Sequence, residues 1–268
     1  MFKPIVQDKL LFPEILWQRP MNIYRRKGRV LILGGEIEIK KTLTFCEFLF
    51  YTQIQKISLG YPDVLSETYQ NILPKECHLP LPSTPSKTLS VLGYEKIKEE
   101  IRNYDLLVIG IGVSQNEETK KLVRKLLRLS SPILLNQEGI LKINPEEIKR
   151  EHPTIYFSDS RTAAHLLAEK INIINENPLP NLEKLSKKLD NVLLLTNQRV
   201  FVTRKTETVV TEFQPKEEPL LATVAAFWAE NLKKPFESAA VAAFITKTWQ
   251  ENFSKIADLK KAIDKNDF

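Results

Sequence analysis

The stretch Arg29-Val-Leu-Ile-Leu-Gly-Gly35 decides the fold class. After its first residue it is an unbroken aliphatic run, which is typical of a strand buried on both faces of a parallel sheet. The glycine pair that follows predicts a tight turn out of the strand. A second run of the same kind, 105–109, leads into Gly110-Ile111-Gly112. The sequence therefore predicts an α/β protein whose parallel strands end in glycine turns.

Helices and strands alternate along the rest of the chain. The Ser114-Gln-Asn-Glu117 segment has the form of a capping box before a helix, and the prolines of 79–86 predict a connection without regular structure. Further strands are predicted at 56–59, 132–135, 154–157, 191–195, 200–203 and 208–213. Helices are predicted at 40–54 (with Leu43, Cys46, Leu49 and Phe50 buried), at 64–72, after Glu117, at 162–171, and at two C-terminal segments containing 220–232 and 236–244.

Glycine is scarce and unevenly placed. The chain has 8 glycines in 268 residues and none after Gly139, about 3% where roughly 7% is usual. Codon bias against GC-rich triplets is one explanation of the scarcity, but proline, which also has GC-rich codons, occurs 16 times, which weakens it. A glycine-lined phosphate cradle must therefore lie in the first half of the chain or be absent.

Composition otherwise indicates a folded protein of the cytoplasm. The apolar run 220–229 is shorter than the ~18 residues of a membrane span, and Lys3, Asp8 and Lys9 interrupt the apolar residues at the start, as no signal peptide would. Two cysteines without pair spacing predict reduced thiols.

A mild net charge of +6 includes one dense basic cluster, Arg25-Arg26-Lys27 with Arg29. This cluster can contact phosphates or form a solvated loop. Nucleic-acid binding is not favoured, because basic and aromatic residues do not alternate along one strand. His78, His152 and His165 offer no metal-ligand spacing with the cysteines, so no metal site is predicted.

Taken in order, the strand ends resemble those of the ribokinase-like ADP/ATP-dependent NAD(P)H-hydrate dehydratases, which repair hydrated nicotinamide cofactors. The resemblance spans roughly residues 19–250. It rests on Lys27-Gly28 with the strand that follows, on 56–60 and 72–76, on 104–113 (the family's A-D-a-v-v-i-G-P-G-L), and on 132–139 (its P-v-v-L-D-A-D-A).

The resemblance implies a three-layer α/β/α ribokinase-like fold with a mainly parallel central sheet, within the carbohydrate kinase superfamily. The expected division is an N-terminal extension (1–18), the ribokinase-like domain (19–252) and a C-terminal helix or tail (253–268). Implied ligands are ADP or ATP with Mg, and a hydrated nicotinamide cofactor. The expected binding residues are Lys27, Gly34, Gly35, Gly110, Gly112, Asn136 and Glu138. The pairs Asn136/Glu138 and Lys27/Arg29 can equally cap turns, and Gly110-Ile111-Gly112 can be a tight turn only.

The diagnostic residues of the family are missing from the second half. Its Thr-Pro-His-x-Gly-Glu turn corresponds to 157–162, and its Leu-Lys-Gly segment to 195–197, with Val200 in place of a threonine. The Gly-Thr-Gly-Asp motif, which in the family holds phosphate charge and supplies an acid–base aspartate, corresponds to Lys216, Glu217, Glu218 and Pro219. Proline has no amide proton to donate, and two glutamates there repel phosphate.

Two functions therefore remain for a chain of this resemblance. One is a degenerate dehydratase-like protein without catalysis, a pseudoenzyme that binds a nucleotide or serves as a scaffold or as the partner of an active relative. The other is an active carbon–oxygen lyase with relocated groups, Glu217 or Glu218. A homo-oligomer is also expected from the resemblance, and the stripe with Trp228 and Trp249 is either an interface or internal core. A cleft beside Gly110-Gly112 and Pro219 that is filled by side chains would argue against every small-molecule ligand at that place.

Overall fold

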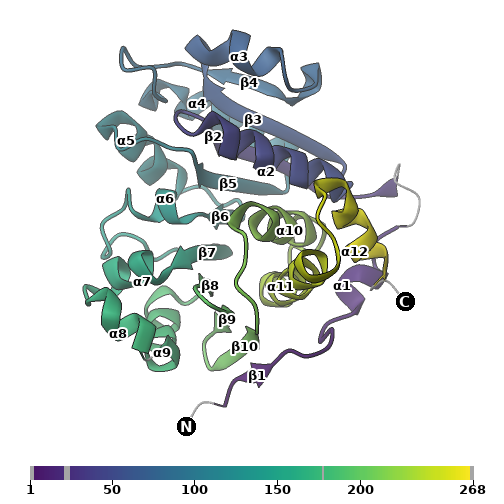
Figure 1. Cartoon of the computed structure of the whole chain (residues 1–268). Helices are drawn as coiled ribbons and strands as arrows, with labels where there is room; N and C mark the ends of the chain where they lie inside the picture. Colours follow the sequence, from purple (N-terminus) through teal and green to yellow (C-terminus); the bar gives the residue numbers. More distant parts are fainter. Residues whose placement is uncertain (1–2, 21–24, 177, 266–268) are drawn as a thin grey trace.

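A computed structural model describes residues 3–20, 25–176 and 178–265. The described strands form one sheet in the order β1-β10-β9-β8-β7-β6-β5-β2-β3-β4 (Figure 1). Strands β2 to β8 are parallel, β9 is antiparallel to β8 and β10, and β1 is parallel to β10. The strands are β1 (Ile5–Val6), β2 (Arg29–Gly34), β3 (Lys56–Pro62), β4 (His78–Leu81), β5 (Leu106–Ile111), β6 (Ile133–Leu135), β7 (Thr154–Asp159), β8 (Val192–Thr196), β9 (Val200–Arg204) and β10 (Glu207–Thr211).

Helices cover both faces of this sheet. Along β2, Val30 and Ile32 belong to one core cluster and Leu31 and Leu33 to the other, as the alternation of a strand requires. The first cluster lies under α1 (Glu14–Trp17), α2 (Ile39–Tyr51), α3 (Ser66–Gln70), α10 (Glu217–Glu230), α11 (Pro235–Asn252) and α12 (Leu259–Lys265). The second lies under α4 (Tyr94–Glu100), α5 (Glu117–Leu126), α6 (Gln137–Ile140), α7 (Ser160–Leu167), α8 (Ile171–Glu176) and α9 (Pro178–Leu189). The three-layer α/β/α expectation is therefore confirmed.

Two helices that are distant in sequence lie side by side at the centre of the first face. Figure 1 shows α2 next to α10, and the two helices are in direct contact. Trp228 of α10 and Trp249 of α11 are buried inside the chain. The tryptophan stripe is thus internal core, and its alternative interpretation as an oligomer interface is wrong.

Three local predictions are wrong, each for a reason visible in the packing. The segment 79–86 was expected to lack regular structure, but its first residues belong to β4, an edge strand where Pro80 lies opposite Tyr61. An edge strand tolerates proline because only one of its sides forms a ladder. Phe50 is 38% exposed; the buried aromatic residues of α2 are Phe45 and Phe48, and Phe48 packs against Trp249 of α11 with ring centroids 5.2 Å apart.

The capping box is the third correction. Ser114 does not cap α5; the side chain of Asn116 does, accepting a 2.8 Å hydrogen bond from the amide of Glu118. The amide of Ser114, which would donate to Glu117 in a capping box, donates to the carboxylate of Glu36 at 2.8 Å instead, and the helix starts at Glu117.

The ends of the described chain contribute to the same sheet and core. Within 1–18, expected to be an extension, the described residues 3–18 supply β1 at the sheet edge and the fully buried Ile15 and Leu16. Leu259 and Ile263 of α12 are buried in the first cluster. Among the described residues, no helix has the length and apolar character needed to cross a membrane.

Candidate functional site

The carboxyl ends of β2 and β5 are bonded to each other through their turns. The amide of Gly35 donates to the carbonyl of Ile111, and the amides of Glu36 and Ile37 both donate to the carbonyl of Gly112, each at 2.9 Å. Backbone amides in such turns bind phosphates in nucleotide sites. Here three of these amides are already satisfied within the protein.

Close approach explains the glycines at these turns. Gly112 has a φ of +64°, and a Cβ on it would overlap the carbonyl oxygen of Ile37. Gly110, with a φ of +114°, lies against the backbone of Gly139, where a Cβ would come within 2.6 Å of the amide nitrogen. The tight-turn interpretation of Gly110-Ile111-Gly112 therefore accounts for both residues.

The carboxylate of Glu138 takes the position of an anion at the second turn. It accepts hydrogen bonds from the amides of Gly112 (2.7 Å) and Val113 (3.3 Å), and its other oxygen lies 2.7 Å from the amino group of Lys41. Glu138 belongs to the short helix α6 after β6, and Lys41 to the first turn of α2. The side chain predicted to bind a ligand thus caps a turn of its own protein.

Glu36 does the same on the other side of the turn. Its carboxylate accepts from the amides of Leu89 (3.1 Å) and Ser114 (2.8 Å) and from the hydroxyl of Thr119 (2.8 Å). The residue is only 8% exposed. Charge-assisted bonds of this kind are strong, so they hold the two turns and the start of α5 together.

A third carboxylate stands at the head of α10. Glu217 accepts hydrogen bonds from the side-chain amides of Asn136 (3.1 Å) and Gln137 (2.9 Å), and lies 3.2 Å from the amino group of Lys41. Lys41, Glu138 and Glu217 therefore meet at the carboxyl ends of β2, β5 and β6. We call these three residues the carboxylate cluster.

The first turn of α10 has little left to offer a phosphate. Lys216 precedes the helix, and its amide donates to the side chain of Gln250 at 2.7 Å. Pro219 is buried in the first turn and has no amide proton. With Glu217 beside it, this helix start does not fit the phosphates of ADP or ATP.

The carboxylate cluster holds two acidic side chains and one basic side chain. Burial alone would lower the pKa of Lys41, but the hydrogen bond with Glu138 and the charge of Glu217 outweigh it and raise that pKa. Burial raises the pKa of Glu217, although Lys41 opposes the change. One ammonium thus faces two carboxylates, a potential that repels phosphate.

A buried lysine lies near this cluster. Lys142 is 2% exposed, and its amino group has no hydrogen-bond partner among the described residues. Burial lowers its pKa, while the charges of Glu138 and Glu36 raise it. The two carboxylates therefore stabilise this ammonium through the electrostatic field.

The remaining predicted residues divide between the two ends of the sheet. Gly34, Gly35, Gly110, Gly112, Asn136 and Glu138 come together at the carboxyl ends of the strands. Lys27 does not: it precedes β2, beside Arg29 and Asp105 at the amino ends. The structure therefore does not bring Lys27 together with these glycines, because the length of β2 separates them.

Asp159, in the position of the family motif at 157–162, and the histidine His78 also form internal contacts. Asp159 ends β7 and caps α7 through a 2.7 Å bond from the amide of Thr162. His78 bonds Tyr61 (3.2 Å) and the carbonyl of Leu73 (3.0 Å). No group of histidines, cysteines and acids among the described residues can hold a metal ion.

Sequence reasoning missed Lys41, Glu36 and Gln137. Each lies within seven residues of a glycine or asparagine that the sequence predicted as a binding residue at a strand end. The sequence contained one indication of these residues. Because α2 and α6 follow the ends of strands directly, their first polar residues are expected at the carboxyl edge of the sheet, where ligands bind in such folds.

Comparisons with known proteins agree with this architecture. No family model matches the sequence. The chain is 23% identical over 119 residues to the bifunctional NAD(P)H-hydrate repair enzyme Nnr of Archaeoglobus fulgidus, an alignment that covers 44% of this chain and 25% of that protein. The match therefore spans about a quarter of that relative's length.

Solved structures match over nearly the whole chain. A hypothetical protein from Streptococcus mutans has a TM-score of 0.72 at 14% identity, over 98% of this chain and 100% of that one. The ADP/ATP-dependent NAD(P)H-hydrate dehydratase of Bacillus subtilis, co-crystallized with ATP/Mg2+ and soaked with CoA, has a TM-score of 0.69 at 14% identity, over 99% and 98%. A ribokinase-like superfamily protein of Enterococcus faecalis has a TM-score of 0.71 at 13% identity, over 95% and 93%.

The chain thus has the ribokinase-like fold. The resemblance to the NAD(P)H-hydrate dehydratases that the strand ends indicated is confirmed.

Proposed function

We propose that this chain is an NAD(P)H-hydrate dehydratase-like protein that has lost catalysis and serves as a scaffold or partner subunit. The observation that carries the proposal is the carboxylate cluster. Side chains of the protein occupy the edge of the sheet where ligands bind in open α/β folds. Glu138 accepts a hydrogen bond from a turn amide, and Glu217, at the start of α10, lies beside the amino group of Lys41.

The charges of these carboxylates disfavour binding of a nucleotide at this place. A phosphate charge about 4 Å from a carboxylate costs roughly 4 kcal/mol at an effective dielectric constant of about 20. Two carboxylates, Glu138 and Glu217, share one cation, Lys41. The lyase chemistry that the resemblance implies also needs an acid–base aspartate, and Pro219 stands at that position.

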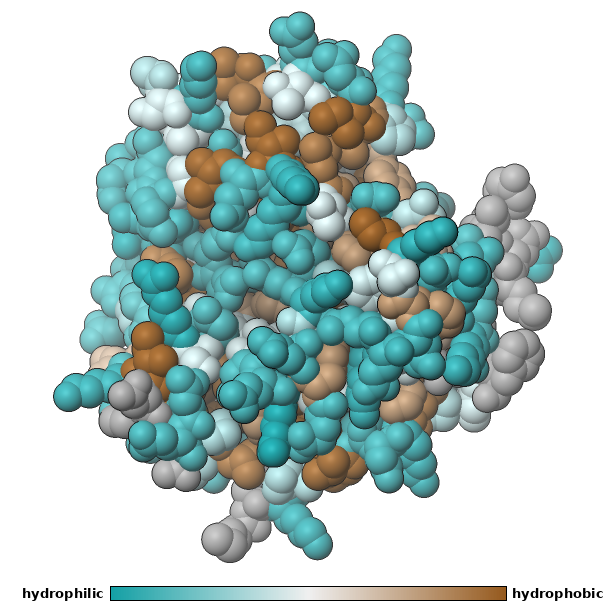
Figure 2. Space-filling view, in the orientation of Figure 1, coloured by the Kyte–Doolittle hydropathy of each residue, from teal (hydrophilic) through white to brown (hydrophobic). Residues whose placement is uncertain are grey.

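A partner role needs an exposed surface, and the outer side of α2 supplies one. Phe50 is 38% exposed and Ile72 57% exposed, and a hollow of about 340 Å³ lies between them, also lined by Leu43 and Leu73. Figure 2 shows hydrophobic side chains gathered in the upper part of the view, where Figure 1 places α2 and α3. Such surfaces often mark contacts with other proteins.

One observation favours the second candidate, an active lyase with relocated groups. Glu217 is largely buried and has a raised pKa, and general acids and bases in enzymes are tuned in this direction. If Glu217 were the acid–base group, its removal would abolish turnover.

The deciding experiment adds hydrated NADH with ADP or ATP and Mg²⁺ and follows the absorbance of reduced nicotinamide. The Bacillus subtilis dehydratase is the positive control. We expect no turnover from this chain. Turnover would contradict the proposal, and turnover that is lost in Glu217→Ala, but not in the neighbouring Glu218→Ala, would establish the second candidate.

A further inference from the structure

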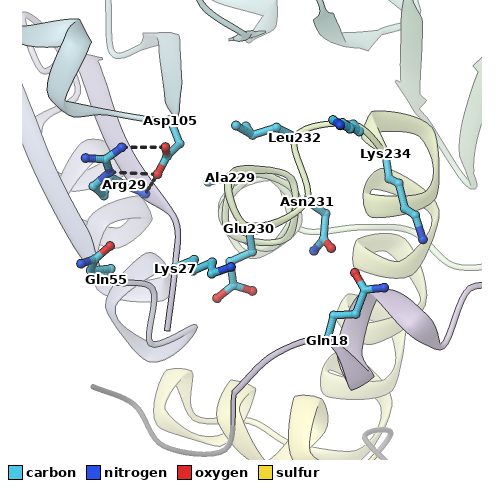
Figure 3. Close-up of a pocket in the computed structure, with 11 residues that line it drawn as sticks. Gln18, Lys27, Arg29, Gln55, Asp105, Ala229, Glu230, Asn231, Leu232 and Lys234 are labelled. Atoms are coloured by element: carbon cyan, nitrogen blue, oxygen red, sulfur yellow. Dashed lines mark hydrogen bonds and ion pairs between the residues drawn. The ribbon is translucent and has the colours of Figure 1, made fainter. Parts of the chain in front are cut away.

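A second cavity lies at the opposite end of the sheet from the carboxylate cluster. It is a pocket of about 520 Å³ between the amino ends of β2, β3 and β5 and the carboxyl end of α10 (Figure 3). A smaller hollow of about 100 Å³ shares Gln18, Lys27, Glu230 and Asn231 with it. Pockets of roughly 300–1,000 Å³ hold cofactor-sized ligands.

The lining of this pocket is cationic. It includes the cations Lys27, Arg29, Lys233 and Lys234 and the carboxylates Asp105 and Glu230. Both carboxylates are engaged: Asp105 by a two-pronged ion pair with Arg29 at 2.9 and 3.0 Å, and Glu230 by Arg19 at 2.6 and 3.2 Å. Figure 3 shows the first of these pairs at the edge of the pocket.

Two lysines remain for a ligand. Lys234 lies 3.4 Å from Glu14, whereas no carboxylate in the described ranges forms an ion pair with Lys27 or Lys233. Both of these side chains are exposed, Lys27 at the start of β2 and Lys233 in the turn after α10. They come from different elements, and both line this pocket.

The helix end at this pocket does not cancel the positive charge. The carboxyl end of a helix carries partial negative charge on its free carbonyls. At the end of α10, the carbonyl of Phe227 accepts from the side chains of Asn231 (2.9 Å) and Ser238 (3.4 Å), and that of Trp228 from the amide of Asn231 (3.0 Å). These bonds reduce the repulsion that an anion would meet there.

The rest of the lining suits an organic ligand rather than a bare ion. Gln18 and Gln55 bring side-chain amides, which can donate to or accept from a polar group. Ala229 and the 37% exposed Leu232 add apolar surface. Leu232 is available because α10 ends at Glu230, two residues before the end of the helix that the sequence predicted.

We propose that this pocket binds a small phosphorylated molecule of nucleotide size, with Lys27 and Lys233 contacting its phosphates. The dense basic cluster that the sequence places before β2 then has a ligand-binding role at Lys27, while its last member, Arg29, is paired with Asp105. The site is separate from the carboxylate cluster, so it does not depend on the loss of catalysis proposed above.

The test is isothermal titration of the full chain with ADP, with inorganic pyrophosphate, and with adenosine as the uncharged counterpart of ADP. We expect saturable binding of ADP that weakens as salt rises and at least tenfold weaker binding of adenosine. Lys27→Gln and Lys233→Gln should each weaken ADP binding about tenfold, as for the loss of one charged contact. Lys149→Gln, an exposed lysine between α6 and β7, is the matched control and should bind like wild type.

Absence of saturable binding of both ADP and pyrophosphate would overturn the inference, as would equal affinities of wild type, Lys27→Gln and Lys233→Gln. Circular dichroism of each variant separates lost binding from lost folding. Nicotinamide turnover tests the proposed function independently. ADP binding that disappears in Lys41→Met but not in Lys27→Gln would place ADP at the carboxylate cluster. That result would contradict both the proposed binding in this pocket and the conclusion that the cluster repels phosphate.

Discussion

The backbone amide of Gly112 donates a 2.7 Å hydrogen bond to the carboxylate of Glu138. In a phosphate-binding turn, an amide in this position is directed at the ligand. Here the acceptor comes from the neighbouring strand end, and Lys41 neutralises it from the other side. The protein thus carries its own anion at a glycine turn, and this relationship can be tested by removing the anion.

Glu138→Ala should create an anion site. The variant exposes the amides of Gly112 and Val113 and frees one contact of Lys41, so sulfate should raise its melting temperature more than that of wild type at equal ionic strength. Without sulfate, the loss of a charge-assisted acceptor should cost about 1–3 kcal/mol of unfolding free energy. Glu146→Ala, an exposed neighbour, is the control. Equal sulfate responses of all three proteins would contradict the prediction.

Lys41→Met should destabilise the fold because it leaves Glu138 and Glu217 facing each other. Side chains in the cluster are 19–24% exposed, so solvent screens part of the effect, and we expect a loss of about 1–3 kcal/mol in urea unfolding. The double variant Lys41→Met/Glu217→Gln should recover part of that loss, since it removes one of the opposed charges. Lys40→Met, an exposed neighbour on the same helix, should stay near wild type. Strictly additive effects of the two substitutions would show that the pair is not coupled.

The pH dependence of stability should report on Glu217. Burial raises its pKa in the folded protein above the ordinary 4.5, so the folded state holds a proton at pH values where the unfolded state has released it. Its contribution to stability is therefore present below about pH 4.5 and is lost as pH rises through the raised value. Glu217→Gln lacks this loss, so its stability relative to wild type should increase from about pH 4.5 toward neutrality.

Urea unfolding at several pH values measures this difference. Glu218→Gln, at the next position of α10, is the matched control for the change of composition and charge. A relative stability of Glu217→Gln that falls as pH rises would contradict the sign of the shift.

The order of the interior strands and helices was predictable because burial produces a recognisable pattern of apolar residues in the sequence. The aliphatic runs at 29–33 and 105–109 indicated strands covered on both faces, and both are interior strands of the sheet. The edge strands were harder to predict. Pro80 made the segment of β4 resemble a connection, and β1, with two residues, is too short to show an alternating pattern.

The site was only half predictable, for a different physical reason. Asn136 and Glu138 stood out because they follow an aliphatic strand directly. Their partners Lys41 and Glu217 are 97 and 81 residues away in sequence, so no local pattern pairs them. Sequence could show that a phosphate-binding motif was missing at 216–219. It could not show that the turn amides and the residues at the start of α10 form contacts within the protein.

Gly112→Ala should be among the most damaging single substitutions. The residue has a φ of +64°, and an added Cβ would overlap the carbonyl of Ile37, which is part of the backbone and cannot simply rotate away. We expect a loss of about 2–4 kcal/mol in urea unfolding, from the strained φ and the displaced turn. Gly93→Ala is the control, because the space around its Cβ is open to 3.6 Å and its φ is negative. A Gly112→Ala protein as stable as Gly93→Ala would mean that the two turns can separate freely.

The two cysteines should be inert in the folded protein. Burial raises the pKa of the Cys46 thiol to about 12 and that of Cys77 to about 11, and both residues are at most 3% exposed. The thiolate is the reactive form, so at about pH 8 a disulfide reagent such as DTNB should modify neither residue in the native state and both in denaturing urea. Cys46→Ser and Cys77→Ser assign any signal to one position. Rapid native modification that disappears in Cys77→Ser would show that the segment before β4 opens to solvent. The place of β4 at the edge of the sheet would permit this while Cys46, on the buried side of α2, remained protected.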